Sequence, residues 1–230
     1  MKKCEALVLK KSNYGEADII VTFYTRELGK VKGLARQAKK SRKRFGGRLE
    51  LFNHLNIDIT LNDNKFNILN EVNIKRSYSG IMRNLETFLI SSFIIEHLDI
   101  LTIENEPNDQ LFDYATEAFG YMEKNENILS NLLKFQLKAL KTSGYEPDLK
   151  SDTDKDYINF DISKGVSISE SKQANSKNIY KFYIDIIKIP EKMDIFLGKV
   201  AKNIKVLTKY MEYHVEKKFK TSQFLEELNL

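Results

Sequence analysis

The sequence predicts an α+β protein in which a small five-stranded β-barrel is followed by an α-helical domain. Three observations predict it: short β-rich runs over about the first 75 residues, helical periodicity after Ser79, and a small alternating pattern within residues 151–178. The length of 230 residues suits one large or two modest domains. We therefore expect a barrel domain at 1–78 and a helical domain at 79–230.

Five runs rich in β-branched, aromatic or alternating residues predict the strands of the barrel. Gly15 and Gly29 separate the first three runs, and the turn cluster 62–64 predicts a hairpin between the last two. Five strands without a helix is the count of the Greek-key OB barrel, which closes its edges at this size and is a frequent nucleic-acid platform. The runs are residues 6–9, 19–24, 30–35, 55–61 and 66–74.

Apolar residues at three- and four-residue spacings predict helices from Ile81 onward. Pro107 marks the start of the second helix, and Gly144 followed by Pro147 ends the third. The serine-rich stretch 151–178 reads as a polar loop that carries a small hairpin. The expected stripes are 81–98, 111–122 and 129–140, the hairpin runs are 158–162 and 166–168, a long helix covers 193–215, and a final short helix holds Phe224, Leu225 and Leu228.

Charge is distributed unevenly along the chain. Residues 1–80 hold 17 basic and 8 acidic side chains, residues 81–150 hold 6 and 12, and the whole chain carries a net +5. A basic first third beside an acidic middle suggests two units with different partners. Basic clustering of this kind is typical of a surface for a polyanion.

The densest signal is the cationic segment, residues 30–48, which has nine cations and no Asp or Glu. Such a segment repels itself, so we expect a mobile loop that an anionic ligand orders, the alternative being a solvated loop. Nearby aromatic residues are candidates for stacking on bases, although core positions are also expected among them. The predicted nucleic-acid-binding residues are Lys30, Lys32, Arg36, Lys39, Lys40, Arg42, Lys43, Arg44, Arg48, Phe45 and Tyr14.

Few residue patterns point to catalysis or to a cofactor. The three histidines stand on different predicted elements, and no glycine-rich phosphate loop ends in Lys-Ser or Lys-Thr. We therefore expect no catalytic residue, no cofactor and no metal. A nuclease that uses carboxylates and magnesium remains an alternative, because paired carboxylates leave no sequence signature.

The composition indicates a cytoplasmic protein that does not enter membranes. Cys4 is the only cysteine, so no intrachain disulfide can form and a reducing compartment is the simplest expectation. The longest apolar run, 88–95, is too short to cross a bilayer, and no apolar segment of signal-peptide type follows the first lysines.

The long helix expected after Pro190 carries lysines opposite its apolar stripe. An ordinary solvated face explains this pattern. The alternatives are a binding site for an acidic peptide, for a further length of nucleic acid or for a membrane surface. We select Lys199, Lys202 and Lys209 as candidate partner-binding residues.

Five motifs stand out by their order and spacing along the chain. They are Tyr14-Gly15-Glu16-Ala17-Asp18, Thr25-Arg26-Glu27-Leu28-Gly29-Lys30, Ala35-Arg36 through Lys40-Ser41-Arg42, Gly144-Tyr145-Glu146-Pro147-Asp148-Leu149, and Lys220-Thr221-Ser222-Gln223-Phe224-Leu225. Their order and spacing resemble those of the bacterial RecO recombination mediator family. The resemblance covers the whole chain and is strongest in the barrel and at both ends.

This resemblance implies an OB barrel joined to a helical domain, without enzymatic turnover. It implies binding of single- and double-stranded DNA, annealing of complementary strands, and loading of RecA together with RecR and single-strand-binding protein, whose acidic C-terminal tail is the expected ligand of the lysine face. Many family members carry two Cys-x-x-Cys pairs that hold zinc, but the corresponding places near 151–154 and 168–171 lack Cys and His, so we expect no zinc.

Two other classes of function stay open at this point. An RNA-binding or ribosome-associated OB protein would have the same charge and fold, and only competition between DNA and RNA separates it from the DNA-binding hypothesis. The second class is a scaffold protein that binds no nucleic acid. Alanine substitution of Arg42, Lys43 and Arg44 without loss of DNA affinity would favour it.

Overall fold

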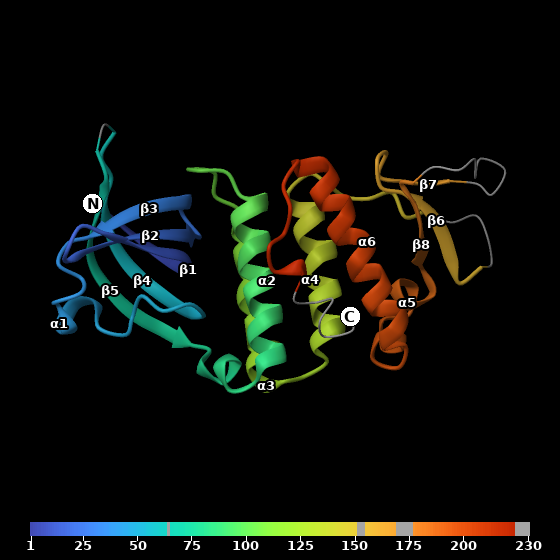
Figure 1. Cartoon of the computed structure of the whole chain (residues 1–230), viewed down its shortest axis with the longest axis horizontal. Coiled ribbons are helices and arrows are strands. Elements are labelled where there is room, and N and C mark those ends of the chain that lie inside the picture. Colours follow the sequence, from blue (N-terminus) through green and yellow to red (C-terminus); the bar gives the residue numbers. More distant parts are fainter. Residues whose placement is uncertain (64, 151–154, 169–176, 224–230) are drawn as a thin grey trace. The chain divides into compact units, whose positions relative to one another are not determined.

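The computed structural model describes residues 1–63, 65–150, 155–168 and 177–223. The chain forms two compact units, Met1–Lys124 and Asn125–Leu230. A closed barrel and two long helices make up the first unit, and helices with a small sheet make up the second (Figure 1). The predicted α+β fold class is confirmed. The predicted domain boundary after residue 78 follows the last barrel strand, whereas the first compact unit continues through two helices, so that boundary stays a prediction.

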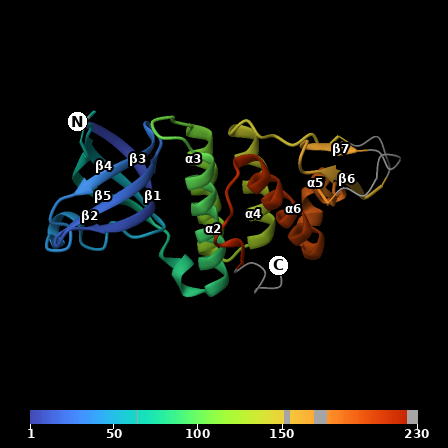
Figure 2. The same cartoon turned by 45° about the horizontal axis from the view of Figure 1, so that its top comes forward.

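The barrel contains five strands in the order β1-β2-β3-β5-β4, closed by the pairing of β4 with β1 (Figure 2). All neighbours are antiparallel except β3 and β5, which pair in parallel through Gly33–Asn67 and Leu34–Ile68. This is the arrangement of the OB barrel, as the strand count predicts. The strands are β1 (Lys2–Tyr14), β2 (Asp18–Thr25), β3 (Gly29–Ala35), β4 (Asn53–Thr60) and β5 (Asn67–Ser77).

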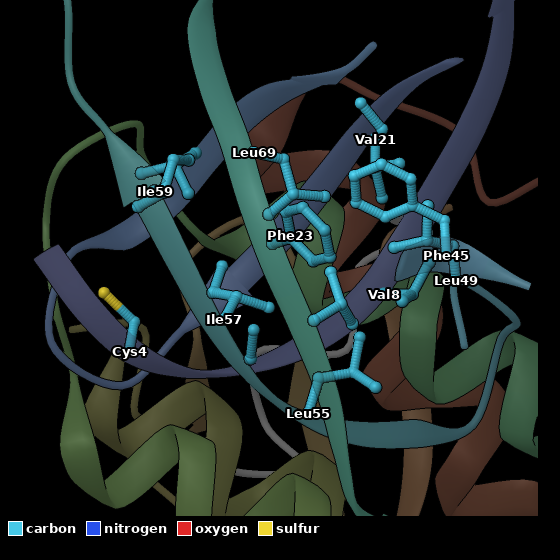
Figure 3. Close-up of a cluster of buried hydrophobic side chains, with 14 residues drawn as sticks. Cys4, Val8, Val21, Phe23, Phe45, Leu49, Leu55, Ile57, Ile59 and Leu69 are labelled. Atoms are coloured by element: carbon cyan, nitrogen blue, oxygen red, sulfur yellow. The ribbon is translucent and has the colours of Figure 1, made fainter. Parts of the chain in front are cut away.

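Apolar side chains from all five strands fill the barrel (Figure 3). Phe23 of β2 is fully buried among Ile57 and Ile59 of β4 and Leu69 of β5 in this cluster. Each such side chain contributes roughly 1.5–3 kcal/mol to stability relative to an exposed one. Cys4 belongs to the same core, and its burial raises the pKa of the thiol to about 11.

Three helical segments follow the barrel in the first unit: η1 (Ser79–Arg83), α2 (Leu85–Leu101) and α3 (Asp109–Lys124). The Asn84 side chain accepts a hydrogen bond from the Glu86 amide at the start of α2, and Asn108 does the same for the Leu111 amide at the start of α3. Phe52 lies edge-on against Phe88 of α2 and Phe119 of α3. These aromatic contacts join the helices to the end of the barrel.

Acidic residues of these helices pair with cations of the barrel. Arg26 pairs with Asp113, and Arg76 pairs with Glu123 at 3.0 Å. The acidic middle of the sequence and its basic first third therefore partly neutralise each other inside one compact unit. The interpretation of the charge pattern as two units with different partners stays a prediction, and these ion pairs add that some charges of the two regions meet within one unit.

The connection between α2 and α3 lies against the start of β3. The Asn105 amide donates to the Lys30 carbonyl at 3.1 Å, and the Tyr24 hydroxyl donates to the Asn108 carbonyl at 2.9 Å. A Cβ atom on Gly29 would lie 2.2 Å from the Glu106 carbonyl oxygen, and Gly29 itself has a φ of +66°. Only glycine allows both this conformation and this close approach.

An alanine in the left-handed conformation costs roughly 1–2 kcal/mol. We expect Gly29→Ala to lower the free energy of unfolding by more than this, because the segment between α2 and α3 must also move away from the new methyl group. Gly47→Ala is the matched control, since Gly47 has a φ of +69° and open space around its Cβ position. Urea denaturation measures both variants. Equal losses would show that the close approach to Glu106 contributes nothing.

His97 of α2 is fully buried, and its Nδ1 lies 2.7 Å from the Phe93 carbonyl oxygen. Burial lowers the pKa of His97 to about 4, because an imidazolium is disfavoured away from water. The folded pKa lies below the unfolded value of about 6.5, so the unfolded chain binds the proton first as the pH falls. Above about pH 6.5 the His97 side chain is neutral in both states, so its burial costs nothing. As the pH falls from about 6.5 to about 4, only the unfolded chain gains the proton, and the free energy of unfolding declines.

We expect His97 to account for about 2 kcal/mol of the stability that the wild type loses between pH 7 and pH 5. His97→Gln has no titrating group at this position, so its loss over the same range is expected to be smaller by that amount. Urea denaturation of both proteins at the two pH values provides the comparison. An identical loss in the two proteins would contradict this assignment.

The second unit contains α4 (Ile128–Thr142), α5 (Asp185–Lys188), η3 (Pro190–Asp194), α6 (Leu197–Val215) and a sheet of β6 (Tyr157–Asp161), β7 (Val166–Ile168) and β8 (Ile179–Tyr183) in the order β7-β6-β8. The predicted hairpin is confirmed as β6 and β7. The sequence interpretation missed β8. The buried Asn203 side chain holds this strand at Tyr183, because its oxygen accepts from the Tyr183 amide and its nitrogen donates to the Tyr183 carbonyl, both at 2.8 Å. The predicted helix at Phe224, Leu225 and Leu228 lies outside the described residues.

Candidate nucleic-acid interface

The cationic segment runs from β3 through the short helix α1 (Arg42–Phe45) to the loop before β4. Phe45 and Leu49 of this segment insert into the barrel core, and each is 3% exposed (Figure 3). Only three residues separate them, so the backbone between must stay close to the barrel. Their burial fixes the polar residues around them at the barrel surface.

Backbone hydrogen bonds attach the same segment to the turn between β1 and β2. The Lys39 amide donates to the Ala17 carbonyl at 3.0 Å, and the Gln37 amide donates to an Asp18 carboxylate oxygen at 2.7 Å. The segment therefore has backbone contacts of its own, and its mobility in the absence of an anionic ligand stays a prediction. Two apolar anchors and local hydrogen bonds hold the backbone, while the cationic side chains lie outside.

Lys30 and Lys32 differ from the other predicted cations because each has an acidic partner in the first unit. The Lys30 ammonium lies 3.3 Å from Asp99 and its side chain is only 13% exposed, and the Lys32 ammonium lies 2.6 Å from Glu104. A cation that is already neutralised contributes less to the attraction of phosphates. These two residues belong to the contact between barrel and helices.

Six further cations of the segment lie at the surface or are partly exposed: Arg36, Lys39, Lys40, Lys43, Arg44 and Arg48. Within the described part of the chain, none of the six has an acidic partner at ion-pair distance. The Arg44 guanidinium donates to the Arg36 carbonyl at 3.1 Å and lies over the Phe45 ring, which brings the two arginines together. The position of the Arg42 side chain is not described.

The structure corrects the prediction that Phe45 stacks on a base. Its ring is part of the barrel core, so it holds α1 in place instead of facing a ligand. Tyr14, by contrast, is 45% exposed and makes an edge-to-face contact with Phe66, which is 42% exposed. Their ring centroids lie 5.3 Å apart with the planes at 66°.

Phe66 lies on a groove between β3 and the hairpin that joins β4 to β5. This region and the loops beside it are where OB barrels bind oligonucleotides. The sequence interpretation did not include Phe66, although an aromatic residue two positions after the turn cluster 62–64 was a usable signal. The groove is lined by Leu34, Arg36, Asn62, Asp63, Lys65, Phe66 and Ile68.

The candidate partner-binding lysines of α6 have different surroundings. Lys199 lies 2.6 Å from Asp185 and 3.3 Å from Asp156, and the hydrogen bond that its ammonium donates to the Asp185 carboxylate raises the pKa of Lys199. Lys199 is therefore occupied within the second unit, contrary to a role as a free docking cation. Lys202 lies over the Tyr183 ring at 5.6 Å and Lys209 over the Tyr180 ring at 4.6 Å.

Lys209 also lines a pocket in the second unit with Tyr180, Tyr213, Phe219 and Lys218. Glu212 of the same pocket pairs with Lys218 at 2.9 Å, so the Lys209 ammonium and the aromatic faces are what suits a ligand with both apolar and anionic groups. Among the described residues, no group of three or more His, Cys, Asp or Glu side chains could hold a metal ion. Nor does any described helix have the length and apolar character needed to span a membrane.

The barrel and the helices after it define an OB-barrel protein with a helical extension, and two protein-family comparisons specify it further. Residues 1–78 match "Recombination protein O N terminal" and residues 82–178 match "Recombination protein O C terminal". The chain belongs to the RecO family. The family resemblance in the sequence is thus confirmed.

Curated relatives named "DNA repair protein RecO" are similar to the chain. The protein of Syntrophus aciditrophicus is 33% identical over 148 residues, which are 64% of this chain and 57% of that protein. The protein of Desulforamulus reducens is 26% identical over 245 residues, covering 98% of this chain and 94% of that protein. The protein of Rhodopirellula baltica is 30% identical over 145 residues, covering 62% of this chain and 53% of that protein. Two of these three matches therefore span little more than half of the relative's length.

Because Phe45 is a core residue, we expect Phe45→Ala to lower the free energy of unfolding by about 3–5 kcal/mol. Phe45→Leu keeps most of the apolar volume but removes the aromatic ring. We expect its affinity for single-stranded DNA to stay within about twofold of the wild type, measured by fluorescence anisotropy at a temperature where both proteins are folded. A large loss of affinity in folded Phe45→Leu would restore the ring as a base-stacking residue.

Proposed function

We propose that the protein binds single- and double-stranded DNA in the cytoplasm and acts in DNA repair and recombination by annealing complementary strands. The observation that carries this proposal is a group of six surface cations for which the described residues provide no acidic partner, held on an OB barrel by buried anchors. Membership in the RecO family supports DNA as the ligand, because the similar curated proteins carry the name of a DNA repair protein.

The proposed mechanism is electrostatic. Two complementary strands repel each other through their phosphates, and cations that neutralise phosphates of both strands on one surface lower this repulsion, so that base pairing proceeds. The protein makes and breaks no covalent bond in this process. The anchoring by Phe45 and Leu49 matters here, because it keeps the cations near one another before DNA arrives and so reduces the entropy lost on binding.

Partner proteins form the second part of the proposal. We propose that the protein works with RecR and with single-strand-binding protein to load the recombinase RecA onto single-stranded DNA. The acidic C-terminal tail of single-strand-binding protein is the expected ligand of the second unit. Lys202 and Lys209 with the pocket at Tyr180 and Phe219 support this placement, whereas Lys199 is neutralised by Asp185.

An RNA-binding OB protein is the alternative, because phosphate contacts do not distinguish DNA from RNA. Competition by unlabelled RNA of the same sequence and length tests it directly. Weaker competition by RNA than by DNA supports the proposal, and stronger competition overturns the choice of DNA.

We expect the protein to accelerate annealing of two complementary labelled oligonucleotides, and we expect Arg42→Ala, Lys43→Ala and Arg44→Ala together to weaken that acceleration at least tenfold. If six cations contact phosphates, the logarithm of single-strand affinity falls with the logarithm of salt concentration with a slope of about −4. Rapid-mixing fluorescence and salt titrations measure the two quantities.

The matched control removes three exposed cations elsewhere in the first unit, Lys2, Lys3 and Lys124, by the same substitutions. The control keeps the same net charge as the triple variant of α1, so any difference reports position. Equal effects of the two triple variants, or a flat salt response of the wild type, would contradict a DNA site on the cationic segment.

A further inference from the structure

The connection between α2 and α3 carries acidic residues to the edge of the barrel (Figure 1). We call residues 102–107 the acidic strap, because they contain Glu104 and Glu106 and no lysine or arginine. β2 pairs along the whole of one edge of β3, and β5 pairs with the end of the other edge. The strap continues this second edge, because Glu104 forms a parallel bridge with Lys30. The strap therefore lies where a further strand of the sheet would lie.

The side chains of β3 form a row that leads from the strap to the cationic segment. Val31 and Ala35 belong to the barrel core. Because side chains alternate along a strand, Lys30, Lys32 and Leu34 lie on the outer face, roughly 6.5 Å from one to the next. Leu34 lines the groove that borders the cationic segment. Lys32 is therefore placed between the acidic strap and the six surface cations described above.

The two lysines beside the strap are held differently. The Lys30 ammonium donates to the Asp99 carbonyl at 2.6 Å, and the Lys30 side chain is only 13% exposed. The Lys32 ammonium lies 2.6 Å from the Glu104 carboxylate, and both side chains are 54% exposed. Water and salt weaken an exposed pair of this kind, so another anion can replace Glu104. Lys30 therefore stays paired, whereas Lys32 can change partners.

We propose that the acidic strap is an intramolecular competitor of nucleic acid, in which Glu104 binds Lys32 until a DNA phosphate displaces it. This inference rests on the proposed function, because it assumes that the cations next to Lys32 bind DNA. The apparent affinity of a site that includes Lys32 is reduced by the fraction of molecules in which the carboxylate has left. The strap thereby limits how tightly the barrel holds a strand.

The backbone of the strap keeps the competing carboxylate in place. The Asn105 amide, directly after Glu104, donates to the Lys30 carbonyl at 3.1 Å. This bond attaches the strap to β3 two residues before Lys32. A carboxylate that is attached in this way is present at a high effective concentration, so it competes with phosphates although the ion pair itself is weak.

A competitor of this kind suits a protein that anneals strands. Single strands and the duplex product both present phosphates, so a surface that binds phosphates very tightly would also retain the product. As a phosphate leaves Lys32, the Glu104 carboxylate can return to it. The competitor therefore lowers the affinity for the strands and favours release of the duplex by the same exchange.

The test measures the affinity for a single-stranded oligothymidylate by fluorescence anisotropy at several salt concentrations. Glu104→Gln keeps the shape of the side chain and removes its charge. We expect this variant to bind roughly two- to fivefold more tightly than the wild type. Because Lys32 then adds one phosphate contact, the slope of the logarithm of affinity against the logarithm of salt concentration becomes steeper by about 0.7.

Lys32→Gln distinguishes displacement of Glu104 from general repulsion. In the wild-type background we expect Lys32→Gln to change the affinity less than about twofold, because Glu104 already occupies the lysine. We expect the gain from Glu104→Gln to disappear when Lys32→Gln is also present. A gain of the same size in the double variant would show that the charge of Glu104 acts without Lys32, and the proposal would be overturned.

Glu106→Gln is the matched control, because it removes the same charge from the same strap. Glu106 is exposed, and the described residues place no cation at ion-pair distance from its carboxylate. We expect the affinity of this variant to stay within about 1.5-fold of the wild type. An equal gain in Glu106→Gln, or no gain in Glu104→Gln, would overturn the competitor while the proposed DNA binding stands. Failure of the wild type to bind the oligothymidylate would overturn the proposed function, and this inference with it.

Discussion

Burial of Phe45 and Leu49 in the barrel is the interaction on which the candidate interface depends. The cations around them repel one another, and two unit charges 4 Å apart in water do so by about 1 kcal/mol. Each buried anchor contributes roughly 1.5–3 kcal/mol in the opposite direction. The segment can therefore hold a fixed backbone although it contains no acidic residue, and the cations remain where solvent and ligands reach them.

The sequence predicts most of the architecture, because hydrophobic periodicity differs clearly between strands and helices. All five barrel strands, the three helices between Leu85 and Thr142 and the hairpin of β6 and β7 lie where the patterns place them. β8 was missed because it follows a polar stretch directly and its place in the sheet depends on pairing with β6, more than fifteen residues earlier in the sequence. Such non-local pairing leaves little local signal.

The candidate site is less predictable, because the role of a charged or aromatic residue depends on which neighbours it meets in space. Lys30 and Arg44 look alike in the sequence, yet one is paired with Asp99 and the other lies at the surface. Phe45 and Phe66 likewise look similar, but one fills the core and the other faces a groove. Sequence reasoning identified the cationic segment as a whole, whereas the contribution of individual residues required the fold.

The buried position of Cys4 has a practical consequence for studying this protein. It is the only cysteine of the chain, and a thiol whose pKa is raised to about 11 forms almost no thiolate near neutral pH. Reagents that attack thiolates will therefore react slowly with the native protein. A cysteine introduced on the surface is then the single position that carries a fluorophore or a spin label. The environment of that position can be followed during DNA binding without first removing Cys4.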